Sequence, residues 1–260
     1  MSGRPRTGGI VAVVAHPDDE ALIAGGTLAL AADAGIATGI VSLTRGELGP
    51  ISDQLLADQR TLGMVREREL RASGAILGVD WTHCLRQPDG ELEWADAETV
   101  ASELAALLFD SSPAVLLTFG ADGIYGHADH VATRDIAGRA AALLAPAIPA
   151  LYEAVWAPTL AAELVADARA HGLPDSLWGI EPEAFGSPAG CATRVDVRAA
   201  IDRKLAALRA HRTQLDDDHL LLALPAELAA RHLDKEAWRP ADPSAPDVLA
   251  GLLRVHLAHD

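Results

Sequence analysis

The sequence predicts an α/β fold, a three-layer sandwich in which helices cover both faces of a mostly parallel sheet. Short apolar runs alternate with helix-length segments over the first 156 residues. The runs are continuous and rich in β-branched residues, which is typical of strands buried on both faces. Half of the 260 residues are hydrophobic, enough to bury a large core. Strands that alternate with helices of this length indicate parallel pairing.

The expected strands are short and are followed by loops that carry Gly, Pro or charged residues. The first, residues 10–15 (IVAVVA), contains no polar residue and should be buried on both faces. Further strands are expected at residues 37–43, 81–85, 114–119 and 150–156, and a less regular one at 191–197.

Helix-length segments fill the intervals between these strands. The first, residues 21–35, is rich in Ala and Leu and ends at a glycine, which often terminates helices. Further helices are expected at residues 59–77, 97–109, 127–144, 198–214 and 247–256. The alternation weakens beyond Ala157. We therefore expect one domain over residues 1–260, with a motif-bearing core at about 9–215, a modified C-terminal third and a C-terminal elaboration at about 216–260.

The charge balance and the cysteines narrow the class of partner and the compartment. With 37 acidic and 21 basic residues, the formal net charge is -16. Such a chain is not expected to bind nucleic acid or an anionic membrane, since both need a basic surface. Cys84 and Cys191 cannot form a disulfide framework, and the first apolar run is too short to span a membrane. We expect a cytoplasmic protein that acts on a small molecule, and its oligomeric state stays open.

Two clusters of metal-type side chains follow two of the expected strands. The first is HPDDE (residues 16–20), directly after the strand at 10–15, and the second is GHADH (residues 126–130), after the strand at 114–119. In doubly wound sheets, ligands bind outside the carboxyl ends of the strands. Both clusters open on that edge, so we expect them to converge.

The combined clusters contain the groups that metal-assisted hydrolysis needs. A catalytic zinc takes three His or carboxylate ligands and leaves a position open for water, and His16, Asp19 and His130 supply that set. Ferrous iron binds similar sites. Asp18, beside Asp19, is the expected general base for the water, whose pKa a metal lowers from ~15.7 to about 7. His127, one helical turn before His130, is the expected stabiliser of the oxyanion.

Each cluster also has a simpler interpretation. HPDDE alone could be a turn followed by an acidic helix N-terminus. An isolated H-x-x-H pair is more often solvated or part of a helix cap. The occurrence of both clusters at strand ends of one α/β chain favours the metal site.

The two motifs resemble those of the LmbE/PIG-L family of zinc-dependent N-acetylglucosaminyl deacetylases. AHPDDE (15–20) and YGHADH (125–130) carry the resemblance, and TRGE (44–47), residues 66–70 and LRAHRTQ (208–214) add to it. The similarity covers about residues 9–215. It implies a Rossmann-like fold and removal of acetyl groups from N-acetylated amino sugars, as in mycothiol, bacillithiol and glycosylated-antibiotic pathways.

The resemblance also implies residue roles. It places the metal on His16, Asp19 and His130, makes Asp18 the general base, and makes His127 the protonated stabiliser of the oxyanion.

Three further side chains become candidate substrate contacts. The resemblance implies that Tyr125 helps to polarise the acetyl carbonyl and that Glu47 and Arg66 contact the sugar or its aglycone. A packed loop aromatic and ordinary salt bridges are the alternative interpretations. Asp129 could orient a metal-bound histidine or cap the helix, and Glu20 could do the same for the first cluster. His211 is expected to be a structural or surface residue rather than a fourth ligand.

The expected function is a metal-dependent N-deacetylase, a hydrolase that releases acetate and a free amine from an amino-sugar-containing small molecule. Three alternatives stay open. An amidase could act on a larger N-acyl or thiol-conjugate substrate in the same fold. A two-metal phosphoesterase needs more bridging carboxylates than the motifs provide. A non-catalytic sugar-binding scaffold would be expected to lack one of the catalytic groups, and all are present. The sequence does not determine which N-acetylated substrate is used.

Overall fold

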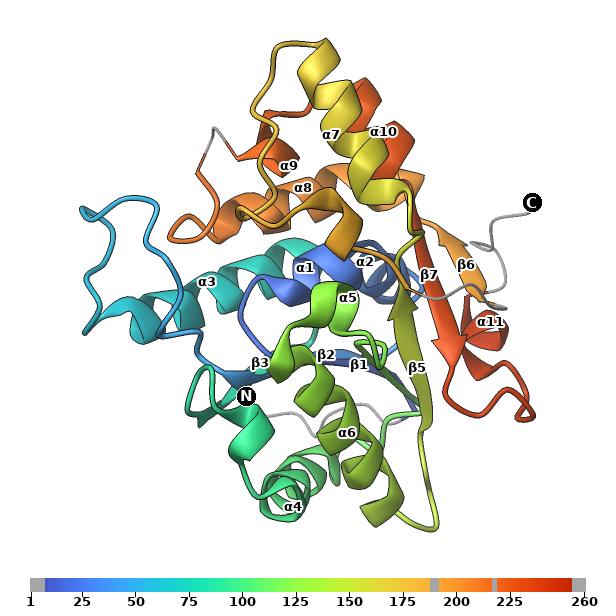
Figure 1. The fold of residues 1–260 in the computed structure, drawn as a ribbon. Coiled ribbons are helices and arrows are strands. Elements are labelled where there is room, and N and C mark those ends of the chain that lie inside the picture. The colour runs from blue at the N-terminus through green and yellow to red at the C-terminus, as the bar shows by residue number, and fades with distance from the viewer. Residues whose placement is uncertain (1–7, 188–191, 217–218, 254–260) are drawn as a thin grey trace.

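A seven-stranded sheet with the strand order β3-β2-β1-β4-β5-β7-β6 runs through the centre of the molecule (Figure 1). The computed structural model describes residues 8–187, 192–216 and 219–253. Helices lie on both faces of the sheet, so the predicted three-layer α/β fold is confirmed. Within the described ranges, no helix is both long enough and apolar enough to cross a membrane.

Five parallel strands form most of the sheet, and all five coincide with expected strands. They are β1 (Ile10–Val14), β2 (Thr38–Thr44), β3 (Trp81–Gln87), β4 (Val115–Thr118) and β5 (Ala150–Val155). β1 pairs with β2 on one side and with β4 on the other, and every residue of β1 is buried. The strand order therefore reverses beside β1, which creates the crevice where doubly wound sheets bind ligands.

Two further strands, β7 (Lys235–Pro240) and β6 (Thr193–Asp196), complete one edge of the sheet, and β7 pairs antiparallel with both β5 and β6. β6 lies within the expected strand at 191–197, whose Cys191 is outside the described residues. β7 was not predicted, because its sequence KEAWRP has a charged or proline residue at four of six positions. It buries Glu236 and Trp238, on one face of the strand. The C-terminal elaboration thus supplies a strand of the central sheet.

The helices divide between the two faces of the sheet. One face carries α1 (Asp19–Ile23), α2 (Gly25–Asp33), α3 (Leu62–Leu77) and α8 (Ile201–Ala210), and the other carries α4 (Ala97–Leu108) and α6 (Ala128–Leu143) (Figure 1). The C-terminal third adds α7 (Leu160–Ala170), α9 (Leu220–Ala223), α10 (Ala226–Leu233) and α11 (Val248–Leu252). Single turns are α5 (Gly123–Gly126), η1 (Leu92–Trp94), η2 (Pro182–Ala184) and η3 (Arg198–Ala200).

The helix expected at residues 21–35 is divided at Ala24, whose φ of -129° is not helical. Glu236 of β7 accepts hydrogen bonds from the backbone N–H groups of Gly26 and Thr27, both at 2.8 Å. A carboxylate there caps the start of α2 and interacts favourably with the helix dipole. A Cβ on Gly26 would lie 2.4 Å from Cβ of Val197, so only glycine fits. The break is thus fixed by contacts with distant residues.

The helix expected at residues 198–214 also differs, because α8 ends at Ala210. His211 follows with φ -86° and ψ 57°, which turns the chain out of the helix. Of the residues that follow, Gln214 and Leu215 line a cavity. This early ending brings the C-terminal third to the site described next.

Candidate active site

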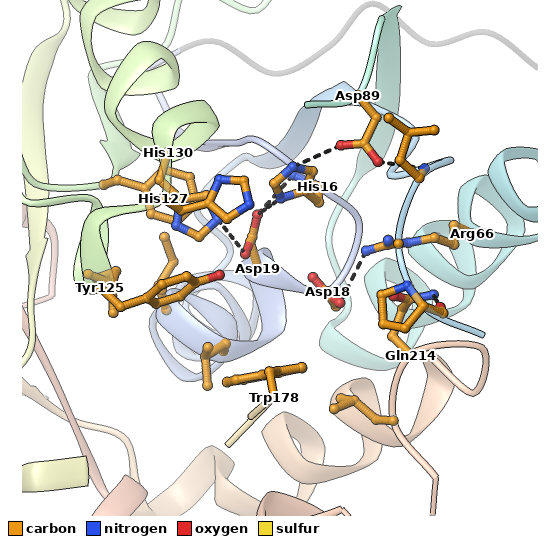
Figure 2. A pocket seen from close by; sticks show the side chains of 18 of the residues that line it. His16, Asp18, Asp19, Arg66, Asp89, Tyr125, His127, His130, Trp178 and Gln214 are labelled. Atoms are coloured by element: carbon orange, nitrogen blue, oxygen red, sulfur yellow. Dashed lines mark hydrogen bonds and ion pairs between the residues drawn. The ribbon is translucent and has the colours of Figure 1, made fainter. Parts of the chain in front are cut away.

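A cavity of about 370 Å³ opens at the carboxyl end of β1, beside β4. Loops that follow four parallel strands and the chain around the end of α8 form its walls (Figure 2). The lining residues are His16, Asp18, Asp19, Leu22, Ile23, Leu48, Gly49, Pro50, Arg66, Asp89, Gly90, Phe119, Ile124, Tyr125, His127, His130, Trp178, Leu208, Gln214 and Leu215. The two sequence motifs therefore converge at the predicted edge of the sheet.

The chain after β1 makes a strained turn at Asp18. This residue has φ 123° and ψ -33°, in the region that L residues rarely adopt. Asp19 then begins α1, and its Oδ2 accepts the backbone N–H of His16 at 2.8 Å. As a result, the adjacent carboxylates point to different partners, Asp19 to the histidines and Asp18 to Arg66 (Figure 2).

Three potential ligand side chains surround one point beside Asp19. Nδ1 of His16 lies 3.3 Å from Oδ2 of Asp19, and Nε2 of His130 lies 3.4 Å from Oδ1. Donor atoms placed tetrahedrally at the usual zinc distances of ~2.0–2.1 Å are themselves about 3.3–3.4 Å apart. Among the described residues, no hydrogen-bond partner reaches the buried Nε2 of His130. The donor set therefore fits a small divalent cation.

The orientation of His130 is fixed by its surroundings. Its Nδ1 donates to the carbonyl of Gly123 at 3.1 Å, which leaves the Nε2 lone pair facing His16 and Asp19. Its ring stacks on Phe119, with centroids 3.9 Å apart and planes at 5°. A histidine held on its face and at one nitrogen is well prepared to bind a metal with the other.

Two carboxylates lie behind His16, on the side away from Asp19. Nε2 of His16 is 3.3 Å from Oδ2 of Asp129 and 3.1 Å from Oδ1 of Asp89. Burial lowers the pKa of His16, but hydrogen bonds to Asp129, Asp19 and Asp89 raise it well above its usual value. Asp129 thus occupies the orienting position that the sequence offered as one interpretation. Asp89 was missed, although it too follows a parallel strand, and that rule could have identified it.

Asp18 lies beside the ligand set in contact with a buried arginine. Burial raises the pKa of Asp18 to about 6, while the charge of Arg66 opposes this shift. Nη2 of Arg66 donates to Oδ2 of Asp18 at 3.1 Å and to the carbonyl of Pro17 at 2.6 Å, and Nη1 donates to the carbonyl of Gly46 at 2.8 Å. Arg66 therefore fixes the direction of the Asp18 carboxylate.

His127 stands over His130 at the start of α6. The two rings stack with centroids 4.6 Å apart, and Nδ1 of His127 accepts the backbone N–H of Asp129 at 3.2 Å. Burial and the neighbouring His130 and His16 lower the pKa of His127 to about 4. Because Nδ1 accepts a hydrogen bond, the proton of the neutral ring lies on Nε2, and the protonated ring that the family resemblance implies stays a prediction. The Nε2–H group can still donate to an oxyanion.

Tyr125 reaches the cavity from the irregular turn α5. Ile124 has φ 69° there, and Asp122 stabilises the turn by accepting the N–H of Ile124 at 2.7 Å. The ring packs edge-on against His130 at 5.3 Å, and its hydroxyl points into the cavity (Figure 2). Burial and the nearby aspartates raise the pKa of Tyr125, so the phenol stays protonated and can donate. This placement is compatible with the predicted substrate contact.

Glu47 does not lie among the described residues that line the cavity. Its Oε1 accepts the backbone N–H of Asp89 at 3.3 Å, so it reaches the site through that residue. Trp178 and Gln214 line the opposite wall, and sequence reasoning gave neither a role. Trp178 lies with φ 54° in a tight turn, between Leu177 and Ile180, which form a β-bridge. The isolated turn around Trp178 carries no signal that places it at the site, whereas Gln214 ends the LRAHRTQ segment (208–214) that belongs to the family resemblance.

This arrangement suits a metal-dependent hydrolase. Three donor atoms converge on one point, the Asp18 carboxylate lies beside them, and His127 offers an N–H donor next to His130. The sequence profile of the PIG-L family, described as GlcNAc-PI de-N-acetylase, matches residues 11–141, about half of the chain. The chain belongs to this family, whose deacetylases use a metal ion.

Individual relatives extend the similarity to most of the chain. The 1D-myo-inositol 2-acetamido-2-deoxy-alpha-D-glucopyranoside deacetylase of Acidothermus cellulolyticus is 33% identical over 276 residues, covering 94% of each chain. The protein of the same name from Nakamurella multipartita is 35% identical and covers 85% of this chain and 82% of its own. The solved N,N'-diacetylchitobiose deacetylase of Pyrococcus horikoshii shares the fold, with a TM-score of 0.59 and 23% identity over 89% of this chain and 83% of its own.

Proposed function

We propose that this protein is a zinc-dependent deacetylase that removes the N-acetyl group of an amino-sugar-containing small molecule. The products are acetate and a free amine. The observation that carries the proposal is the convergence of His16, Asp19 and His130 beside Asp18 in one cavity. The donor set suits zinc, and ferrous iron is the alternative ion. Curated relatives named as deacetylases of an inositol-linked 2-acetamido sugar support the choice of substrate class.

The cavity favours a small conjugate over the larger N-acyl substrate of the alternative function. Its volume of about 370 Å³ is near the lower end of the ~300–1,000 Å³ range of small-molecule sites. Leu48 lines the cavity and is 67% exposed, so it marks the mouth. Arg66 and Asp89 form a polar wall for sugar hydroxyls, and Trp178 faces the cavity from the apolar wall.

The chain's own groups divide the work of hydrolysis. A divalent ion held by His16, Asp19 and His130 would lower the pKa of a water molecule and polarise the acetyl carbonyl. Asp18 takes a proton from the attacking water, whose oxygen bonds to the acetyl carbon. His127 Nε2–H and the Tyr125 hydroxyl lie where they can donate to the oxyanion.

Collapse of the tetrahedral species breaks the C–N bond. The protonated Asp18 then gives its proton to the departing nitrogen, so the same carboxylate serves as base and acid. A pKa of about 6 suits both roles near neutral pH, since the group is ionised yet close to the operating pH. Arg66 keeps the carboxylate aimed at the cavity while the proton moves.

A substrate panel tests the proposed function directly. The purified zinc-loaded protein is expected to release acetate from an inositol-linked N-acetylglucosamine, from N,N'-diacetylchitobiose or from free N-acetylglucosamine, with the inositol conjugate fastest. Matched N-butanoyl and bulkier N-acyl analogues should react more slowly, because the cavity is small. Acetate is measured by a coupled assay and the free amine by derivatisation. Faster release from the bulky analogues would favour the amidase, and binding without release would favour the sugar-binding scaffold.

On the acidic side of the pH profile, kcat should follow the ionisation of Asp18. The base works in its ionised form, so kcat falls as the pH drops through its pKa. Burial raises that pKa to about 6, and a bound cation would lower it somewhat, so half-maximal kcat is expected at or slightly below pH 6. Arg66→Met removes the charge that lowers the pKa and should move this midpoint to higher pH. A kcat that is independent of pH between about 4.5 and 8 would contradict the assignment.

A further inference from the structure

A network of fully buried polar side chains is hydrogen-bonded to Asp18, and none of these side chains takes part in the proposed hydrolysis. Glu20, Ser73 and His211 come from α1, α3 and the end of α8, and none of the three is exposed. Oε1 of Glu20 accepts hydrogen bonds from Ser73 Oγ at 2.6 Å and from His211 Nε2 at 2.7 Å. Its Oε2 accepts the backbone N–H of Asp18 at 2.9 Å. The network thus ends on the main chain of the expected base.

That main chain is held in a conformation that its own sequence disfavours. Asp18 has φ 123° and is not glycine, and such backbone persists only where the surroundings determine it. The same conformation separates the directions of the Asp18 and Asp19 carboxylates. Arg66 restrains the side chain of Asp18 but donates to no backbone group of that residue. The N–H group of Asp18 is held by the side chain of Glu20, whereas its carbonyl accepts the N–H groups of Ala21 and Leu22 at 3.1 and 3.3 Å in the first turn of α1.

We propose that Glu20, held by His211 and Ser73, is a positioning residue for Asp18. It fixes the strained turn so that one carboxylate faces the water and its neighbour faces the metal. This inference rests on the proposed function, because it gives Asp18 the role of base. His211, which the sequence predicted to be structural or at the surface, becomes a support that acts on catalysis through Glu20 and Asp18.

Glu236 of β7 offers a matched control, because its network also involves α8. Glu236 is also buried, also accepts backbone N–H groups, from Gly26 and Thr27, and is also paired with a cation of α8, Lys204 Nζ at 2.7 Å. Its bonds hold the start of α2 and do not reach Asp18. Each network contains a buried, hydrogen-bonded carboxylate, but only the network of Glu20 reaches the backbone of Asp18.

A double-mutant cycle separates positioning from general stability. In the zinc-loaded enzyme, His211→Ala is expected to lower kcat about 10- to 100-fold, the range for losing an outer partner of a metal site. Ser73→Ala removes one neutral hydrogen bond and should lower kcat about 3- to 10-fold. KM should change less than about 2-fold. In the Asp18→Asn background the same substitutions should change the residual kcat less than about 2-fold, because their effect passes through Asp18. Glu236→Gln should lower the Tm but leave kcat per folded molecule unchanged.

Two measurements do not depend on turnover. Zinc affinity, measured with a competing chelator, should stay within about 3-fold of wild type in the Ser73→Ala and His211→Ala variants. Their crystal structures should show Asp18 outside the positive-φ region that the wild type occupies. If His211→Ala does not fold, His211→Gln and Ser73→Ala supply both arms of the cycle.

Several results would overturn the inference. Equal losses of kcat in the wild-type and Asp18→Asn backgrounds would mean that the network only stabilises the fold. A parallel loss of zinc affinity would mean that it acts on the metal ligand Asp19 instead of Asp18. An unchanged Asp18 conformation in the variants would remove its physical basis. Failure of the proposed function has a different signature: the wild type would release no acetate, whereas the crystallographic arm would still decide whether the network holds the turn.

Discussion

Asp18→Asn is expected to lower kcat for acetate release by about 10²–10⁴-fold, the usual contribution of a positioned general base. The amide keeps the size of the side chain and can still accept a hydrogen bond from Arg66, but it cannot take a proton from water. KM should change little, because Asp18 is not expected to hold the ground-state substrate. Steady-state assays of both proteins, each loaded with one equivalent of zinc, measure the effect.

The stability of the same variant shows whether the loss is chemical. The raised pKa of Asp18 means that its ionised form destabilises the metal-free fold, and this effect grows as the pH rises from about 4 through 6. At neutral pH, Asp18→Asn is therefore expected to raise the Tm of the metal-free protein. Zinc stoichiometry should be retained, since Asp19 still points to the histidines. Full activity of Asp18→Asn would remove Asp18 from the base role.

His130→Ala is expected to abolish stoichiometric zinc binding and, with it, turnover. His130 supplies one of three donors, and its buried Nε2 has no hydrogen-bond partner within the described part of the chain. Loss of a direct ligand should weaken zinc binding by more than the ~10–100-fold typical of losing an outer-shell partner. Metal content after dialysis and affinity against a chelator measure this independently of activity.

An exposed histidine provides the control for that prediction. His171, after α7, is exposed, and its Nδ1 interacts with the carbonyl of Asp167. His171→Ala should leave zinc content and kcat unchanged. Chelation of the wild type should reproduce the His130→Ala phenotype, and added zinc should restore only the wild type. Stoichiometric zinc in His130→Ala would place the metal elsewhere, for example on the overlapping set of His16, Asp89 and Asp129.

The fold class was predictable because its signals are local. Continuous apolar runs such as residues 10–14 indicate strands buried on both faces, and in alternation with helices they are typical of a parallel sheet with helices on each side. β7 escaped prediction because Glu236 occupies a buried position in it. A buried carboxylate is favourable there only through its bonds to α2 and to Lys204, which lie far away in sequence.

The chemistry of the site was also predictable in outline. Residue types at the ends of two strands predicted a His–Asp–His donor set, and these three side chains converge because the topology of a parallel sheet brings strand ends together. The placement of the His127 ring was not predictable, since it depends on the stacking against His130 and on the hydrogen bond with the N–H of Asp129. Asp89 came from a third strand end that carries a single acidic residue instead of a motif.

By itself, the sequence determined the parallel sheet, the edge that carries the site and the donor atoms available there. These follow from periodicity and from residue types next to strands, which act over a few positions. Tertiary structure decided how those groups are aimed: the strained turn at Asp18, the carboxylates behind His16, and the burial of His211 against Glu20 across 191 positions. A side chain's direction and protonation depend on whichever groups the fold brings to it, and no local pattern specifies those partners.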